Sequence, residues 1–233
     1  KTQEGINHYI SPLKQIGAAF NYYVNKKGVF CNGPLEGMAF LNLDQNDEKV
    51  NFQLHFSPIC IKNEYGYDAY DIYDYPKEDG FTILPTLLHP KSRGTVSLSS
   101  SDPNANPKIQ PNFLHEKDDL DQLVKGGKLV YKLMNDKSLS KHIKSHGLPH
   151  DRSSDDSLIA HIKKTLETVY HPVGTCKMGN DPSSVVDSNL KVYGLSNLRV
   201  IDASIMPTIV SGNTNAAVYM IAEKGSDLIL LKN

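Results

Sequence analysis

The sequence predicts an α+β fold, in which an antiparallel sheet with flanking helices is followed by short strands and a last helix. Apolar runs of strand length fall between residues 37 and 89, and amphipathic stretches with a helical period follow them. No segment repeats at a fixed period, and no low-complexity tract appears. With 233 residues and 39% hydrophobic content, the chain is long enough to bury a core.

The first elements are a helix and three strands. Ser11 followed by Pro12 predicts a helix start, because serine favours the cap and proline the first position, and Gly28 marks the end. The runs GMAFLNL (37–43), VNFQLHFS (50–57) and FTILPTLLH (81–89) then predict an antiparallel sheet. Residues 65–80, which are rich in Tyr and Asp, follow neither period and predict a loop.

The rest of the chain predicts mainly helices. TVSLSS (95–100) predicts a strand, and the prolines after it predict extended chain. Residues 116–134 and 153–170 predict two amphipathic helices. Acidic residues lie at the start of the first, as the helix dipole favours, and Ser and Asp lie at the cap of the second. LKVYG and LRVID predict short strands joined at Gly194, and Asn213 or Thr214 is the expected N-cap of a final helix.

Composition narrows the class of partner. Lys and Arg total 25 against 26 Asp and Glu, so no strong field favours nucleic acid, and a small molecule is the expected partner. The longest uncharged apolar run near the C-terminus, AAVYMIA, is far shorter than the roughly 20 residues of a membrane span. Cys31, Cys60 and Cys176 are too far apart for a disulfide framework or a Cys-x-x-Cys metal site, so no metal is expected.

Two features of the last third bear on chemistry. His171 opens HPVGTCKMG, where Pro172 restricts the backbone and two glycines free it. The N-terminus of the final helix offers free N–H groups and a partial positive charge that can stabilise an anion. A capped helix after a loop is common, so this feature alone does not identify a function.

The order HPVGTCKMG, VVDSNLKVYGLSNLRVIDASIMP, SGNTNAA resembles the C-terminal signature of the glucose-methanol-choline (GMC) oxidoreductase family. HPKSRGTVSLSSSDPNANPKIQPNFL resembles the family's passage into that region. KKGVFCNGPLEGMAFLN resembles animal, insect-type glucose dehydrogenase-like members. The likeness covers nearly the whole chain and is most specific in residues 170–217. It implies a substrate-binding domain over 1–165 and a return into an FAD-binding α/β domain, with its last strands and helix, over 166–233.

The resemblance implies an FAD-dependent enzyme that oxidises the CH–OH group of an alcohol. His171 matches the family's active-site histidine, and imidazole can accept a proton at neutral pH. Asn213 matches a second catalytic position, where an amide can donate a hydrogen bond but cannot take up a proton. The residues that the resemblance assigns to the cofactor are Tyr170, Asp202, Ala203, Asn213 and Thr214.

One family motif is absent from the sequence. No Gly-x-Gly-x-x-Gly opens a strand–helix unit, although such glycines let the backbone approach a dinucleotide. The resemblance therefore implies a missing N-terminal FAD-binding half as partner, and we expect the chain alone to bind FAD poorly and to be inactive. KTQEGINHYI lacks an initiating Met and a signal-peptide core, which suggests a processed or truncated product. Only the resemblance suggests secretion.

Two alternatives stay open. Some family relatives are hydroxynitrile lyases without net redox chemistry, and a truncated family member could act without catalysis. Cys176 is interpreted as a packing residue. The remaining histidines match no motif and are interpreted as surface or hydrogen-bonded side chains, namely His8, His55, His89, His115, His142, His146, His150 and His161.

Overall fold

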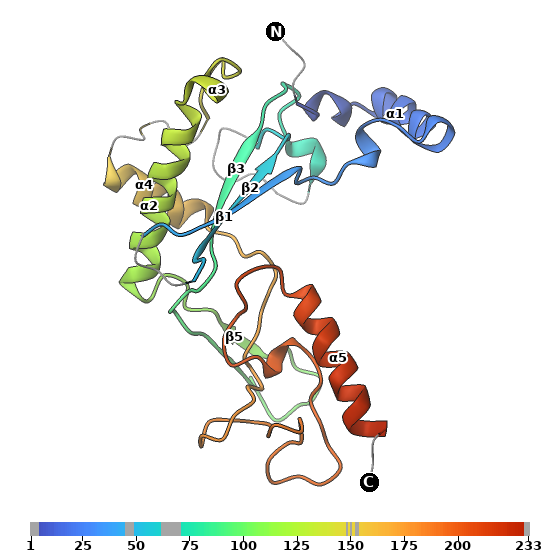
Figure 1. The fold of residues 1–233 in the computed structure, drawn as a ribbon, viewed down its shortest axis with the longest axis vertical. Coiled ribbons are helices and arrows are strands. Elements are labelled where there is room, and N and C mark those ends of the chain that lie inside the picture. Colours follow the sequence, from blue (N-terminus) through green and yellow to red (C-terminus); the bar gives the residue numbers. More distant parts are fainter. Residues whose placement is uncertain are drawn as a thin grey trace. The chain divides into compact units, whose positions relative to one another are not determined.

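A computed structural model describes residues 5–44, 49–61, 71–147, 149, 151 and 154–230 (Figure 1). The chain forms two compact units, each built from two stretches. Unit 1 contains Lys1–Leu87 and Leu120–Leu166, and unit 2 contains Leu88–Asp119 and Glu167–Asn233. The sequence predicts one division near residue 165, whereas residues 88–119 also belong to the C-terminal unit. The roles of the two domains stay predictions.

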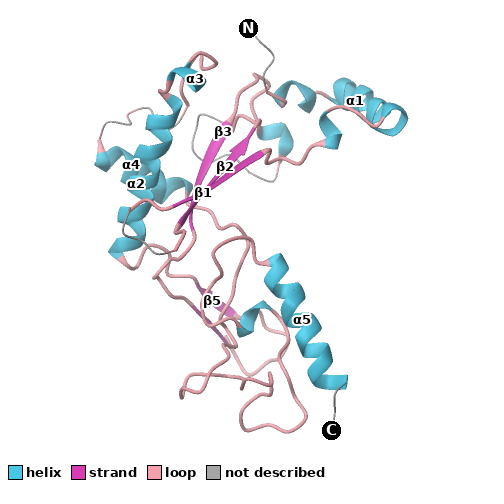
Figure 2. Cartoon of the chain, in the orientation of Figure 1, coloured by secondary structure: helices cyan, strands magenta, loops and turns pink. Residues whose placement is uncertain are grey.

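Unit 1 contains the predicted sheet (Figure 2). β1 (Gly37–Leu41), β2 (Phe52–Ser57) and β3 (Thr82–Leu87) are antiparallel, with β2 in the centre. Phe52 lies opposite Leu41 on one side and Leu87 on the other, and its side chain is fully buried. The three strand predictions and the antiparallel sheet are confirmed.

Helix α2 (Lys117–Met134), from Leu120 onward, and helix α4 (Asp155–Thr165) belong to unit 1, and the short α3 (Lys137–Ser140) lies between them in the chain. In α2 a methyl group at Gly126 would lie 2.0 Å from Cζ of Phe52, so this helix approaches β2 closely. Helix α4 ends five residues before the predicted Tyr170. A helix is disfavoured there by the β-branched residues Thr165, Thr168 and Val169. Leu166 has a ψ of 124°, which lies outside the helical range.

The N-terminal part of unit 1 contains the predicted first helix. η1 (Asn7–Ile10) leads into α1 (Pro12–Asn25), and η2 (Val29–Cys31) follows. Ser11 occupies the N-cap position of α1 as predicted, but its side chain makes no capping hydrogen bond, and the left-handed residue Lys26 ends the helix before Gly28. In the predicted loop 65–80, residues 65–70 lie outside the described residues, and η3 (Ile72–Asp74) is a single short turn.

Unit 2 has little regular sheet. β4 (Thr95–Ser97) pairs with β5 (Lys108–Gln110). Part of the proline-containing stretch that was expected to be only extended chain therefore forms a second strand. The predicted strands LKVYG and LRVID are wrong as regular strands, because only isolated bridges such as Lys191 with Arg199 form there. Leu190 and Asn197 adopt positive φ, which interrupts an extended ladder.

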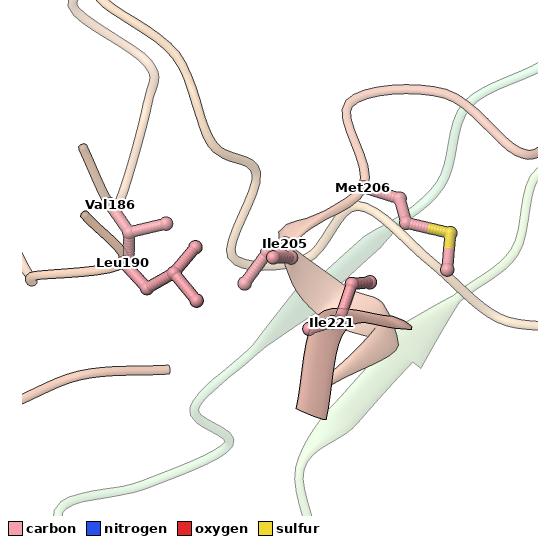
Figure 3. Packing of buried hydrophobic residues seen from close by; sticks show 5 residues of the cluster. All are labelled: Val186, Leu190, Ile205, Met206 and Ile221. Carbon is pink, nitrogen blue, oxygen red and sulfur yellow. The ribbon is translucent and has the colours of Figure 1, made fainter. Parts of the chain in front are cut away.

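A compact apolar cluster organises unit 2 (Figure 3). η4 (Ala203–Ile205) contributes Ile205, and α5 (Asn215–Leu230) contributes Ile221. The other buried members are Val186, Leu190 and Met206. The final helix is confirmed, with Ile221 buried and Met220 exposed. Within the described ranges, no helix is both long and apolar enough to cross a bilayer.

Candidate active site

Residues 167–170, which follow α4 and precede His171, are exposed, and the chain after them packs on the core of unit 2. Tyr170 has φ of 60°, a conformation that is uncommon for a bulky residue, and its N–H donates to Oγ1 of Thr168 at 3.1 Å. His171 is half-buried, and Val173 packs against the apolar cluster of unit 2. His171 therefore lies between the exposed residues 167–170 and the packed segment that contains Val173.

Two backbone hydrogen bonds join this segment to η4. The N–H of Cys176 donates to the carbonyl of Ser204 at 3.0 Å, and that of Met178 donates to Ile205 at 2.8 Å. Asp202 caps η4, since its carboxylate accepts from the N–H of Ser204 at 2.8 Å. A helix offers no internal acceptor for its first N–H groups, so the backbone of Ala203 can donate to a ligand.

The start of α5 is the third part of the candidate site. The carbonyl of Thr214 accepts from the N–H of Val218 at 2.9 Å, which confirms Thr214 as the N-cap position. Thr214 is buried and Asn213 is exposed. α5 contacts η4, and Ala217 packs against the same cluster as Val173. The structure therefore brings segments 170–179, 202–206 and 213–218 together around one core.

The structure places every predicted site residue in unit 2. The shared core relates the three segments, but none of the hydrogen bonds described joins His171 directly to Asn213. Their catalytic roles, and the cofactor roles of Tyr170, Asp202, Ala203 and Thr214, stay predictions. Of the other predictions, Cys176 is a free thiol, and His150 lies outside the described residues.

Charge and hydrogen bonds fix the end of the His171 segment. Asp181 accepts hydrogen bonds from Ser183 and Ser184, and Lys177 Nζ lies 3.0 Å from its Oδ2. These partners, first the hydroxyl of Ser183 and then the ammonium of Lys177, lower the pKa of Asp181 well below its usual range. The carboxylate of Asp181 is therefore ionised at neutral pH and accepts these hydrogen bonds in the turn after the motif.

The sequence did not predict two hydrogen-bonded contacts in this unit, although His89 was interpreted as a surface or hydrogen-bonded histidine. Nε2 of His89 lies 2.9 Å from Oγ of Ser211, which precedes the start of α5. The buried carboxylate of Asp119 accepts from the backbone N–H groups of Lys91 and Ser92 at 2.7 and 2.8 Å. No local signal could have revealed the first contact, since 122 positions separate its partners.

Known proteins resemble the chain along most of its length. Residues 90–222 match the family model described as GMC oxidoreductase. An alcohol dehydrogenase (acceptor) of Pseudomonas putida is 38% identical over 233 residues, which are 100% of this chain and 41% of that protein. An oxygen-dependent choline dehydrogenase of Proteus mirabilis is 34% identical over 87% of this chain and 35% of its own length.

Solved structures show the same fold. Pyridoxine 4-oxidase from Mesorbium loti has a TM-score of 0.75 and 27% identity, over 86% of this chain and 38% of that protein. A formate oxidase of Aspergillus oryzae, studied for modification of its FAD, has a TM-score of 0.79 and 25% identity. That likeness covers 93% of this chain and 41% of the oxidase.

These matches leave the predicted likeness to insect-type members untested. The chain spans about two fifths of the length of the curated relatives named above. The family model alone covers more than half of the chain, including the segments of His171 and Asn213. The chain belongs to the GMC oxidoreductase family.

Proposed function

We propose that this chain is the C-terminal part of an FAD-dependent oxidoreductase that acts on the CH–OH group of an alcohol, with His171 as the general base. The observation that carries the proposal is the convergence of three segments on one core in unit 2. We assign the sheet of unit 1 to substrate binding and unit 2 to the return into the FAD-binding domain.

The donors of unit 2 fit the cofactor. FAD carries a diphosphate and a ring with polar edges, and both accept hydrogen bonds. The backbone N–H of Ala203, at the first position of η4, is assigned to the diphosphate. The first N–H groups of α5, which follow Asn213 and Thr214 in the chain, are assigned to the flavin ring. Asp202 holds the turn of η4, and Tyr170 precedes the base.

Oxidation of an alcohol removes a proton from oxygen and a hydride from carbon, which leaves a carbonyl group. Bound FAD supplies the acceptor of the hydride. A ring nitrogen of His171 takes the hydroxyl proton, a form of help that is typically worth roughly 10² to 10⁴ in rate. The amide N–H of Asn213 donates to the same oxygen and orients it, and His171 is the sole base of the pair.

A longer protein supplies the rest of the cofactor site in this proposal. The relatives are more than twice as long as this chain, and the sequence contains no Gly-x-Gly-x-x-Gly. We therefore assign the ADP half of FAD to the part of the protein that precedes this region. The names of the relatives suggest alcohols, choline and pyridoxine as the first substrates to test.

The test uses the complete FAD-loaded protein under anaerobic conditions. Each alcohol is mixed with the enzyme, and bleaching of the flavin absorbance gives the rate of the reductive step. We expect His171→Ala to slow bleaching by 10² to 10⁴, the contribution of a general base. The matched control is His115→Ala, which removes an exposed histidine from the same unit and should leave the rate unchanged.

Three outcomes would contradict the proposal. Bleaching by His171→Ala at the wild-type rate would remove the base assignment. Release of cyanide from cyanohydrins without flavin reduction would point to a lyase of the same family. A complete protein that binds no FAD would identify a non-catalytic member.

A further inference from the structure

The segment between β3 and β4 is anchored firmly in unit 2. The buried carboxylate of Asp119 accepts two backbone hydrogen bonds, from the N–H of Lys91 on one oxygen and from the N–H of Ser92 on the other. The hydroxyl of Ser92 accepts from the N–H of Glu116 at 3.0 Å. Leu88 is buried at the start of the segment. The backbone on both sides of His89 is therefore fixed.

His89 extends from this anchored segment to the loop before α5. Its Nε2 lies 2.9 Å from Oγ of Ser211, a hydrogen bond that imidazole and hydroxyl can form with either partner as donor. Ser211 lies in a tight turn, in which the N–H of Gly212 donates to the carbonyl of Val210 at 2.9 Å. The hydrogen bond from His89 to Ser211 thus holds the turn that precedes Asn213 and Thr214 at the start of α5.

We propose that His89 is a positioning residue, which holds Asn213 in the orientation needed for alcohol oxidation through its hydrogen bond to Ser211. This inference rests on the proposed function, because it assigns a task to Asn213. Asn213 is exposed, and the turn before it carries no regular secondary structure. The side chain of His89 supplies an anchor from a part of the chain that is distant in sequence.

The expected effect is on the rate more than on folding. A single hydrogen bond between partly exposed side chains contributes little to stability, because water replaces the lost partner. A displacement of about 1 Å in a reacting group can cost up to roughly 10² in rate. We therefore expect His89→Ala to lower the rate of flavin reduction by about tenfold, within that bound.

The test is a mutant cycle in the complete FAD-loaded protein, with anaerobic flavin bleaching by an alcohol as the readout. His89→Ala and Ser211→Ala should each slow bleaching about tenfold, and the double variant should be no slower than either. His89→Gln, whose amide nitrogen can replace Nε2, should recover most of the rate. His115→Ala, in the same unit, should match wild type.

The decisive background is Asn213→Ala. If His89 acts through Asn213, His89→Ala should cause no further loss of rate in that background, with FAD content and melting temperature unchanged. An equal loss in both backgrounds, or a wild-type rate for His89→Ala, would overturn the inference. If His89→Ala fails to fold, Ser211→Ala and His89→Gln answer the same question.

Failure of this inference is distinguishable from failure of the proposed function. Loss of activity in His171→Ala and Asn213→Ala, together with a wild-type rate in His89→Ala, would reject only the positioning role. A wild-type rate in His171→Ala or Asn213→Ala would reject the proposed catalytic pair first and the positioning role with it.

Discussion

In unit 1 the ring of Phe52 fills the space beside Gly126 of α2, and in unit 2 the side chain of Ile201 fills the space beside Gly225 of α5. Both helices use a glycine for close approach, but their surroundings differ. Phe52 is fully buried in the central strand of a regular sheet, whereas Ile201 is only partly buried among turns and isolated bridges. The fully buried Phe52 should therefore tolerate an added methyl group at Gly126 less than the partly buried Ile201 tolerates one at Gly225.

The largest effect is expected from Gly126→Ala. The new methyl group would lie 2.0 Å from Cζ and 2.6 Å from Cε1 of Phe52, a ring that is buried on all sides. Overpacking of a filled core should lower the free energy of unfolding by about 3 kcal/mol. Denaturant unfolding measures the change, and hydrogen exchange locates it in α2 and β2.

The control for this variant is Gly127→Ala, the adjacent helical position. Its methyl group would lie 3.5 Å from Cδ2 of Leu158, an ordinary contact, so the gain in helix propensity of about 1 kcal/mol should prevail. Equal destabilisation by both variants would show that the helix, and not the contact with Phe52, is sensitive.

A smaller effect is expected from Gly225→Ala. The methyl group would lie 2.3 Å from Cγ2 of Ile201, but this side chain can change rotamer because it is only partly buried. We expect a loss of about 1–2 kcal/mol, confined to unit 2, and weaker retention of FAD by the complete protein. Hydrogen exchange in α5 and flavin content after gel filtration measure both effects.

Gly17→Ala in α1 serves as the matched substitution without a neighbour. A methyl group there meets nothing within 4 Å, so higher helix propensity should stabilise this variant slightly. If Gly225→Ala proved no less stable than Gly17→Ala, the close packing of α5 on Ile201 would contribute little to the stability of unit 2.

The smallest effect concerns the acid stability of unit 2. The folded state lowers the pKa of Asp181 below its ordinary 3.8, chiefly through the hydroxyl of Ser183 and then through Lys177. A depressed carboxyl pKa stabilises the fold at pH values above the ordinary value, and this contribution disappears as the pH falls from about 4. Asp181→Asn should therefore flatten the dependence of stability on pH below about 4.

Thermal unfolding between pH 2 and pH 6 measures this dependence, and hydrogen exchange in residues 177–193 locates it. Asp227→Asn, which removes another exposed carboxylate from unit 2, should retain the wild-type slope. A similar slope in wild type and Asp181→Asn would show that solvent screens the cluster around Asp181 almost completely.

Unit 1 was predictable because its elements are long and periodic. The runs at 37–43, 50–57 and 81–89 became the three strands, and residues 116–134 became α2 within one residue. The strands expected at 190–194 and 198–202 failed because Leu190 and Asn197 adopt left-handed conformations that no apolar pattern records. The end of α4 was placed too late for a related reason, since apolar spacing continues past residues that disfavour a helix.

The sequence alone determined the sheet of unit 1, the long helices and the motifs that carry His171 and Asn213, because local propensity and motif spacing depend on neighbouring residues. Only the tertiary structure decided which segments meet. The joining of the His171 segment to η4, the close approach of α2 to Phe52 and the bond from His89 to Ser211 all depend on contacts between residues far apart in the chain. Such contacts form when apolar faces are buried together, and periodicity shows that a face is buried without identifying its neighbour.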